Sequence, residues 1–354
     1  MNFDLINLIL IPLIIAFVIS IFSTKLVIWL YRQLNWFEDP AVTKRIKDTH
    51  TYPVPRGGGI AVFIAIFIGV SIFLPLDLPI KGILLASLIL TILGVIDDRL
   101  NPSPYLRLLV LVAAAGVVIA SGISIKFVTN PFSGTINLST TLAIMVTLAW
   151  IVSLTIVTDW VKGFDGQLPG IVAISAITIA VLAFRYSADI TQWPVAILAS
   201  ITAGAYLGFL IFNFYPQKIM PGFGGGTLAG FLLAILAILS TTKILTAMVV
   251  LGVPIVDAFY TIIRRISQGR SPFWGDRTHL HHRILDSWGW SKPKTAIFYW
   301  LITAFLGLLA LNLNSQQKLY TIVMLVIVIG ALLLWLNFFS ILFARFDRAK
   351  RSKT

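Results

Sequence analysis

Histidines and arginines gather in one polar segment of a chain that is otherwise strongly apolar. Residues 274–285, WGDRTHLHHRIL, hold three of the four histidines of this 354-residue protein. The side chains suited to bind an anion there are Arg277, His279, His281, His282 and Arg283. Thr278 and Gly289 are suited to cap the two ends of a short helix, so the segment predicts a helix N-terminus that binds a diphosphate. A zinc site and an interfacial amphipathic helix remain open as alternatives.

Aspartates form the second group of residues that could do chemistry. Asp97 and Asp98 are adjacent in GVIDDRLNPSPYLRLL, and two such carboxylates repel unless a cation or a proton relieves them. Mg²⁺ prefers hard oxygen ligands of this kind and shares its coordination sphere with substrate phosphates. Asp159 and Asp165 bracket Lys162 in TDWVKGFDGQLPGI, where a carboxylate could meet a metal or a proton. A solvated helix end and a plain connecting turn are the alternatives.

Glycine-rich stretches precede two of the apolar segments. In KDTHTYPVPRGGGI, residues 47–60, the glycines follow Lys47 and His50, which favours anion binding at a helix start. In MPGFGGG, residues 220–226, the glycines could form a nest of backbone N–H groups around a phosphate. A flexible lead into a helix is the alternative for both stretches.

These polar segments interrupt a chain built mainly of hydrocarbon. Hydrophobic residues make up 58% of it and charged residues 12%, which is too little charge to cover a soluble protein. Apolar segments occupy residues 5–30, 58–75, 80–96, 105–122, 139–157, 170–184, 194–213, 228–241, 244–263, 295–313 and 319–343. We therefore predict an all-α polytopic membrane protein with about 11 (10 or 11) transmembrane helices. Because there is no cysteine, disulfides and thiolate metal sites are excluded.

The basic residues indicate which loops face the cytoplasm. The net charge is +13, and all of the 27 lysines and arginines except Lys81, Lys126, Arg185, Lys243 and Lys318 fall on one set of loops or at the ends of the neighbouring segments. The positive-inside rule then places the N-terminus outside and the C-terminus in the cytoplasm. All the motifs lie in the predicted cytoplasmic loops, near residues 31–57, 97–104, 158–169, 213–227 and 264–294. We treat residues 1–354 as one integral-membrane domain whose positive charge reports topology rather than nucleic-acid binding.

The composition also weighs against transport as the function. A channel or transporter requires polar groups within its spans, and only Asp257 and a few hydroxyl groups are placed there. The chain has no P-loop motif with which to hydrolyse ATP. Chemistry at the inner membrane face is the better prediction.

The ordered motifs resemble those of the polyprenyl-phosphate N-acetylhexosamine-1-phosphate transferase family, over nearly the whole chain. HTYPVPRGGG is similar to the family's first motif, with His50 and the glycines in place. GVIDDRLNPSPYLRL resembles its Asp-Asp motif, with Arg107 where a lysine is usual. The histidine motif, DAFYTIIRR followed by SPFWGDRTHLHHRIL, is the most specific similarity.

Two motifs depart from the family pattern. The central loop of the family usually reads Asn-x-x-Asp-Gly-x-Asp-Gly-Leu; here Asp159 stands at the Asn, Lys162 at the first Asp and Gln167 at the Leu. The next motif, usually Met-Gly-Asp-x-Gly-Ser, is MPGFGGG here and contains no carboxylate. The family's aspartate at that place is associated with Mg²⁺. Either the remaining aspartates hold the metal differently, or the chemistry has changed.

The resemblance implies a transfer of sugar-1-phosphate from a UDP-N-acetylhexosamine to polyprenyl phosphate, with release of UMP. It implies Mg²⁺, or Mn²⁺ in its place, a multi-pass location in the cell membrane, no nucleic-acid partner, and compatibility with a homodimer. On this reading the catalytic residues are Asp97, Asp98 and Asp165, and the metal ligands are Asp165 and Asp98. The residues implied in substrate binding are Lys47, His50, Asp159, Arg277, His279, His281, His282 and Arg283. A catalytically altered relative that binds lipid phosphate or nucleotide sugar is the alternative.

Overall fold

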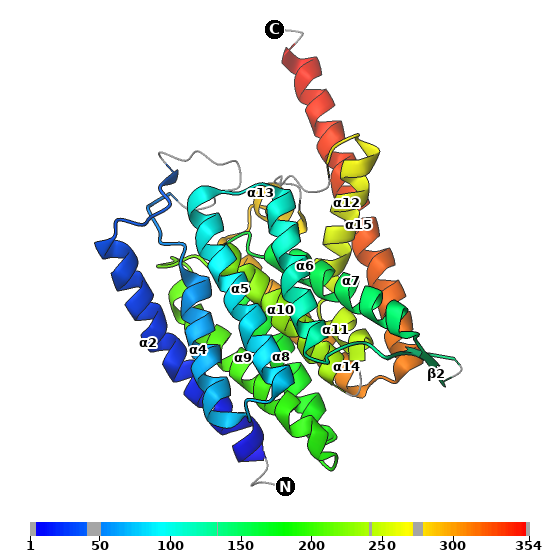
Figure 1. Cartoon of the computed structure of the whole chain (residues 1–354). Helices are drawn as coiled ribbons and strands as arrows, with labels where there is room; N and C mark the ends of the chain where they lie inside the picture. Colours follow the sequence, from blue (N-terminus) through cyan, green and yellow to red (C-terminus); the bar gives the residue numbers. More distant parts are fainter. Residues whose placement is uncertain (1–4, 41–50, 133, 241–242, 272–278, 352–354) are drawn as a thin grey trace.

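The protein is a bundle of long helices with one small hairpin, as seen in a computed structural model that describes residues 5–40, 51–132, 134–240, 243–271 and 279–351 (Figure 1). In chain order the elements are η1 (Ile6–Leu10), α2 (Ile11–Gln33), α4 (Gly58–Phe73), α5 (Leu78–Leu100), α6 (Pro104–Ala120), β1 (Phe127–Asn130), β2 (Gly134–Asn137), α7 (Thr140–Asp159), α8 (Gln167–Arg185), η2 (Ile190–Gln192), α9 (Trp193–Asn213), α10 (Gly222–Leu239), α11 (Lys243–Val250), α12 (Gly252–Ser267), α13 (Leu280–Trp288), α14 (Lys292–Asn312) and α15 (Ser315–Arg351). The two strands pair antiparallel, with Phe127 opposite Asn137.

The number of membrane spans is only partly as predicted. Within the described residues, eight helices are long and apolar enough to cross a bilayer, and the bent pair Ile244–Val250 and Gly252–Ser267 can add a ninth. That pair bends by 82°. Gly58–Phe73 and Pro104–Ala120 are apolar helices of shorter length. Each of the eleven predicted segments thus coincides with a helix or with the bent pair, while the count of about eleven spans stays a prediction.

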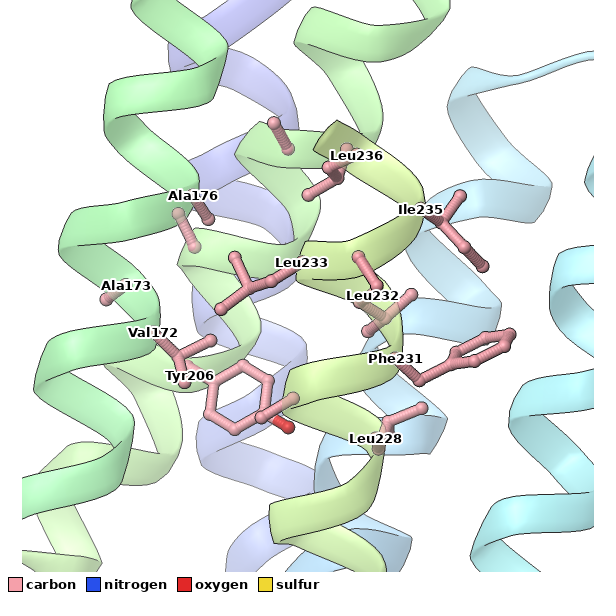
Figure 2. Packing of buried hydrophobic residues seen from close by; sticks show 14 of the residues in the cluster. Val172, Ala173, Ala176, Tyr206, Leu228, Phe231, Leu232, Leu233, Ile235 and Leu236 are labelled. Atoms are coloured by element: carbon pink, nitrogen blue, oxygen red, sulfur yellow. The ribbon is translucent and has the colours of Figure 1, made fainter. Parts of the chain in front are cut away.

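Helix α10 lies at the centre of the bundle. In its most apolar window 89% of the residues are buried, compared with 17% for α15 at the periphery. Figure 2 shows α10 side chains facing α8 and α9; the labelled residues are Val172, Ala173, Ala176, Tyr206, Leu228, Phe231, Leu232, Leu233, Ile235 and Leu236. The outer helices instead expose large apolar side chains, such as Phe22 and Leu301, as a surface in contact with lipid requires.

Glycines bring three helix ends into backbone contact. A Cβ atom added at Gly59 or Gly94 would lie within 2.6 Å of backbone atoms of residues 224 and 225, so neither position has room for a side chain. The N–H groups of Gly58 and Gly59 donate to the carbonyl oxygens of Met220 and Pro221, each at 3.0 Å. These two amides are therefore used within the fold and do not cradle an anion, while anion binding by Lys47 and His50 stays a prediction. Residues 222–226 likewise form the first turns of α10 rather than a loop.

Local signals in the sequence explain where the helices near the motifs begin and end. The carboxylate of Asp77 accepts a hydrogen bond from the Ile80 N–H at 3.0 Å and starts α5. Asn101, with φ of 47°, ends that helix in the left-handed conformation, and Ser103 caps α6 directly afterwards. This sharp reversal places Asp97 and Asp98 in the last turns of α5, at the end of the bundle where α4, α6 and α10 begin (Figure 1).

Candidate active site

Asp98 joins three segments that are distant in sequence. Its Oδ1 atom accepts a hydrogen bond from the Phe223 N–H at 3.1 Å and lies 3.2 Å from Nε of Arg56. Arg56 also pairs with Glu38, at 3.0 Å between Nη1 and Oε2. The adjacent carboxylate, Asp97, forms an ion pair with Arg107 at 2.5 Å. The two adjacent aspartates are thus relieved by two separate guanidinium groups.

Among the cations that pair with these aspartates, Arg56 has the least exposed side chain, at 16%. Burial by itself would lower the pKa of Arg56, but the nearby carboxylates, first Asp98 and Glu38 and then Asp97 and Asp159, raise that pKa above its ordinary value. The guanidinium therefore stays charged and interacts with acids from α5 and α7 as well as with Glu38.

Lys162 occupies the space between the end of α7 and the start of α10. Its ammonium group donates a short hydrogen bond to Oδ1 of Asp159 and another, of 3.1 Å, to the carbonyl oxygen of Gly222. The same ammonium lies 5.1 Å from the centre of the Phe223 ring. The Lys162 side chain is 22% exposed, so it is not completely enclosed by the protein.

Asp165 is completely buried and is held from two directions. Its Oδ1 atom accepts from Nζ of Lys292 at 3.2 Å, and its Oδ2 atom accepts from the Gln217 N–H at 3.2 Å. Gly166, at φ of 79°, directly precedes α8, and its N–H donates to Oδ1 of Asn213 at 3.1 Å. Because left-handed φ values favour glycine, Gly166 fixes the turn that directs Asp165 inward.

The histidine motif forms the predicted short helix, α13, which ends at Gly289 in the left-handed conformation. His279 stands at the N-cap position without a side-chain capping hydrogen bond, and its Nδ1 atom lies 2.9 Å from Oδ2 of Asp257. Thr278, the predicted cap, lies outside the described residues. The Leu280 N–H donates to the other oxygen of the same carboxylate at 2.8 Å. Asp257, which the sequence placed within a span, therefore anchors α13 to α12.

All three histidine rings of this motif are buried. His279 and His281 stack with their planes 3° apart, and His282 lies 4.3 Å from His281 between ring centres. Burial, and then the neighbouring His282 and His279, lower the pKa of His281 well below its ordinary value of 6.5. Their predicted contact with a diphosphate stays a prediction, because the rings are covered in this structure.

The loop at residues 160–165 connects the aspartates with the histidine cluster. The Trp160 ring lies 5.4 Å from that of His279, and the Phe164 ring lies 6.0 Å from that of His281. A Cβ atom at Gly163 would come within 2.0 Å of Nε2 of His281, so the loop packs tightly on α13. Asp159, Asp165 and the histidines are thus parts of one packed region. The cytoplasmic location of this region stays a prediction.

Three predicted substrate-binding residues, Lys47, His50 and Arg277, lie outside the described residues. Arg283, also predicted to bind substrate, lies in α13 and is partly buried. The structure adds cations that the sequence analysis did not assign to the site, namely Arg56, Arg107, Lys162 and Lys292. Arg56 precedes the glycine stretch and Lys292 begins α14, so charge beside a helix start was a usable signal for both.

The carboxylates present do not fit a resident divalent ion in this arrangement. Within the described part of the chain, no three His, Asp or Glu side chains are grouped so as to hold a metal. Asp98 and Asp165, the predicted ligands, are engaged by Arg56 and Lys292. A Cβ atom at Gly222 would lie 2.3 Å from both the Arg56 carbonyl oxygen and Oδ2 of Asp98, so a carboxylate does not fit there either. The predicted role of Mg²⁺ therefore requires a direct test.

The apolar surface and the gathering of paired charges at one end of the bundle define a polytopic membrane protein with a polar site at its rim. Residues 80–241 match the family described as Glycosyl transferase family 4. The decaprenyl-phosphate N-acetylglucosaminephosphotransferase of Mycobacterium leprae is 31% identical over 336 residues, covering 85% of this chain and 81% of the relative. The chain belongs to this family of polyprenyl-phosphate sugar-phosphate transferases.

Two further relatives support this placement. The probable undecaprenyl-phosphate N-acetylglucosaminyl 1-phosphate transferase of Bacillus subtilis is 27% identical, with 90% of both chains covered. The phospho-N-acetylmuramoyl-pentapeptide-transferase of Bacillus pumilus is 34% identical over 152 residues, covering 41% of this chain and 44% of that protein. The Mycobacterium leprae and Bacillus subtilis relatives each cover at least 85% of this chain, so the similarity to them extends beyond residues 80–241.

Proposed function

We propose that this protein transfers N-acetylhexosamine-1-phosphate, of the N-acetylglucosamine type, from a UDP-sugar to polyprenyl phosphate and releases UMP. The membership in the family and the names of its relatives support the reaction class and the lipid acceptor. The observation that carries the proposal is the convergence of Asp97, Asp98, Asp159 and Asp165, each with its own cation, at one end of an apolar bundle.

The reaction joins two polyanions. An oxygen of the lipid phosphate attacks the β-phosphorus of the UDP-sugar, and the bond from that phosphorus to the bridging oxygen breaks. UMP leaves with the electron pair, and the product is a lipid diphosphate sugar. Such a transfer needs positioning and stabilisation of developing charge more than covalent participation by the protein.

Residues of this chain can supply both requirements. Arg56 and Lys162 present positive charge where α4 and α10 begin, and Arg107 adds a third cation at the start of α6. We assign Asp97 or Asp98 to accept a proton from the lipid phosphate. Asp165, which is buried against Lys292, positions the start of α8 and the 215–217 segment around the donor.

The proposed site faces the cytoplasm in the cell membrane. This orientation rests on the distribution of lysines and arginines along the sequence, because most of them fall on the same set of loops as the motifs. A cytoplasmic site gives access to a nucleotide-sugar donor, while the polyprenyl chain lies in the bilayer.

A second candidate function keeps the fold and the ligands but not the chemistry. Lys162 pairs with Asp159, and position 222 has no room for a side chain, so the site differs from the family pattern at two adjacent places. A protein that binds lipid phosphate or nucleotide sugar without turnover is the function that this observation favours.

The test is UMP release by the purified chain in detergent, with undecaprenyl phosphate and a panel of UDP-sugars. We expect UMP from UDP-N-acetylglucosamine or a close analogue, in an amount that matches the lipid product. UDP-sugar without lipid phosphate is the control for hydrolysis. If the protein binds the UDP-sugar or the lipid but releases no UMP with any donor, the binding protein is the correct function.

A further inference from the structure

The Lys162 ammonium lies in an oxygen-lined position between two elements of the site. One side of this position is Oδ1 of Asp159, at the end of α7, and the other is the carbonyl oxygen of Gly222, at the start of α10. A carboxylate oxygen and a backbone carbonyl oxygen are the kinds of ligand that bind hard cations. In this structure the ammonium group of Lys162 fills the position that such a cation would take.

The other carboxylates of the site also act on Lys162. Asp97 and Asp98 interact electrostatically with its ammonium group, although neither is its hydrogen-bond partner. Both of those aspartates have guanidinium partners of their own. Lys162 therefore interacts with three aspartates from α5 and α7, as Arg56 also does, and the negative charge of these aspartates is balanced by cations of the protein itself.

The backbone around residue 222 is shaped to leave its carbonyl, and no side chain, at this position. Gly222 has φ of 68°, and a Cβ atom would lie within 2.3 Å of the Arg56 carbonyl oxygen and of Asp98. At Gly226, one turn along α10, a Cβ atom would lie 2.3 Å from Oδ1 of Asp159. A side chain at either position would collide with Asp98 or Asp159, so neither position of α10 supplies a further ligand.

The ammonium retains the capacity to bind a ligand. An ammonium group has three N–H donors, and two of them are directed at Asp159 and at Gly222. The Lys162 side chain is 22% exposed, and the third N–H is the donor that we assign to an incoming anion.

We propose that Lys162 is a built-in cation of the transferase site: it holds the position between Asp159 and Gly222, binds a phosphate oxygen of the donor, and replaces a divalent ion there. This inference rests on the proposed transfer reaction. The N–H of Lys162 donates to a non-bridging oxygen on the attacked phosphorus, stabilises its charge, and keeps its proton when UMP leaves. Transfer at this site then proceeds without Mg²⁺ bound to Asp159 or Asp98.

The experiment measures metal binding and UMP release separately on the purified full-length chain. Mn²⁺ is the probe, and its binding is followed by loss of the free-ion signal in electron paramagnetic resonance. UMP release is measured with Mg²⁺ and with EDTA. We expect the unmodified protein to bind no Mn²⁺ at this site and to release UMP equally well in EDTA.

Three variants distinguish the roles of the ammonium. Lys162→Met removes the cation, and we expect UMP release to fall about 100-fold. Lys162→Asp places a second carboxylate beside Asp159, and we expect Mn²⁺ binding to appear. Lys294→Met is the matched control: it removes the same charge from a lysine whose ammonium lies 4.2 Å from the Trp290 ring centre, and it should leave both readouts unchanged.

Each outcome decides the proposal. Stoichiometric Mn²⁺ binding by the unmodified protein, together with loss of UMP release in EDTA, overturns it. So does undiminished UMP release by Lys162→Met. If the unmodified protein releases no UMP from any donor, the proposed reaction fails, but the Mn²⁺ measurements still test the role of Lys162 as the cation. Mn²⁺ binding by Lys162→Asp alone supports that role. Equal Mn²⁺ binding by Lys162→Asp and the unmodified protein contradicts it. Mn²⁺ binding and UMP release in EDTA are both measured on the unmodified protein, so a variant that fails to fold does not remove this part of the test.

Discussion

At the scale of single residues, the site is a set of charge pairs between side chains and the backbone around them. Asp97 pairs with Arg107, Asp98 with Arg56, Asp159 with Lys162 and Asp165 with Lys292. A buried pair of this kind contributes little net stability, but removing one partner leaves an uncompensated charge at a high cost. For each pair we therefore expect a single substitution to lower the free energy of unfolding more than the double substitution that removes both partners.

Asp165 gives the sharpest case, because it is completely buried. Asp165→Asn should destabilise the protein by about 3 kcal/mol, since Lys292 then lacks its carboxylate, and should reduce UMP release about 100-fold. The double variant Asp165→Asn with Lys292→Met should recover thermal stability without recovering activity. The midpoint of thermal unfolding and the UMP assay check the two parts. Recovery of activity in the double variant would contradict a role for Asp165 in the reaction.

His281 predicts a dependence of stability on pH. Its pKa lies well below 6.5 in the folded protein, so the unfolded chain takes up a proton at this residue in a range where the folded chain does not. Above the pKa of this histidine in the unfolded chain, His281 is neutral in both states and costs no stability. As the pH drops below that value, only the unfolded chain binds the proton, and the free energy of unfolding falls. The slope approaches about 1.4 kcal/mol per pH unit.

Thermal unfolding between about pH 7.5 and about pH 5.5 measures this effect. The His281→Gln variant should show a smaller decrease of the unfolding midpoint over that interval than the unmodified protein. Tryptophan fluorescence at the higher pH serves as the control for an intact fold. Equal slopes in the two proteins would show that His281 does not carry the effect.

At the scale of elements, backbone approach between α4, α5 and α10 determines the geometry of the site. Gly59, Gly94 and Gly224 allow this approach, and Tyr206 of α9 fixes the start of α10 through a 2.7 Å hydrogen bond from its hydroxyl to the Gly225 carbonyl. The helix starts are therefore held by backbone contacts, and the cations Arg56 and Lys162 are presented from them. Replacing Gly222 by the aspartate that is usual in the family is therefore not expected to rebuild the family's site, because the surrounding atoms leave no room for a side chain there.

Gly222→Ala should destabilise the protein more than a glycine substitution that introduces the same backbone strain alone. Gly222 combines φ of 68° with two contacts of 2.3 Å, whereas Gly269 has φ of 66° and no atom within 4 Å of an added Cβ. We expect a loss of about 1 kcal/mol for Gly269→Ala and roughly 2 to 4 kcal/mol for Gly222→Ala. Gly222→Asp should be at least as destabilised as Gly222→Ala. Equal thermal midpoints for Gly222→Ala and Gly269→Ala would show that the region relaxes freely.

At the scale of the whole molecule, the helices cross from one end of the bundle to the other and collect the polar residues at one of them. The hairpin of β1 and β2 lies toward the opposite end from α13 (Figure 1). The arrangement separates a polar end from an apolar belt, as the proposed transfer from a soluble donor to a membrane lipid requires.

The predicted orientation can be measured directly, because the chain contains no cysteine. Single cysteines at Lys126→Cys, next to the hairpin, and at Arg270→Cys, after α12, both replace exposed residues. A membrane-impermeant maleimide should label the first in intact cells and the second only after permeabilisation. The unsubstituted chain is the control for background labelling. The reverse pattern would invert the topology and place the site outside the cytoplasm.

The sequence by itself determined the class of the protein and much of its outline. Stretches of apolar residues are local signals, so each of the eleven predicted segments coincides with a helix or the bent pair. Gly289 and Asn101 also ended their helices for local reasons, the first of them as predicted. The charge distribution grouped the motif loops, and these loops do meet at one end of the bundle.

The tertiary structure alone decided which charges are partners and which groups are covered. Lys162 meets a carbonyl 60 positions away, and Lys292 meets an aspartate 127 positions away. Such pairings depend on how α7, α10 and α14 pack, which no local pattern encodes. For the same reason the glycines before α4 and within α10 proved to be packing positions, and the histidines of α13 proved to be buried. Side-chain type and spacing predicted where charge would gather; close packing between distant helices determined what each charge touches.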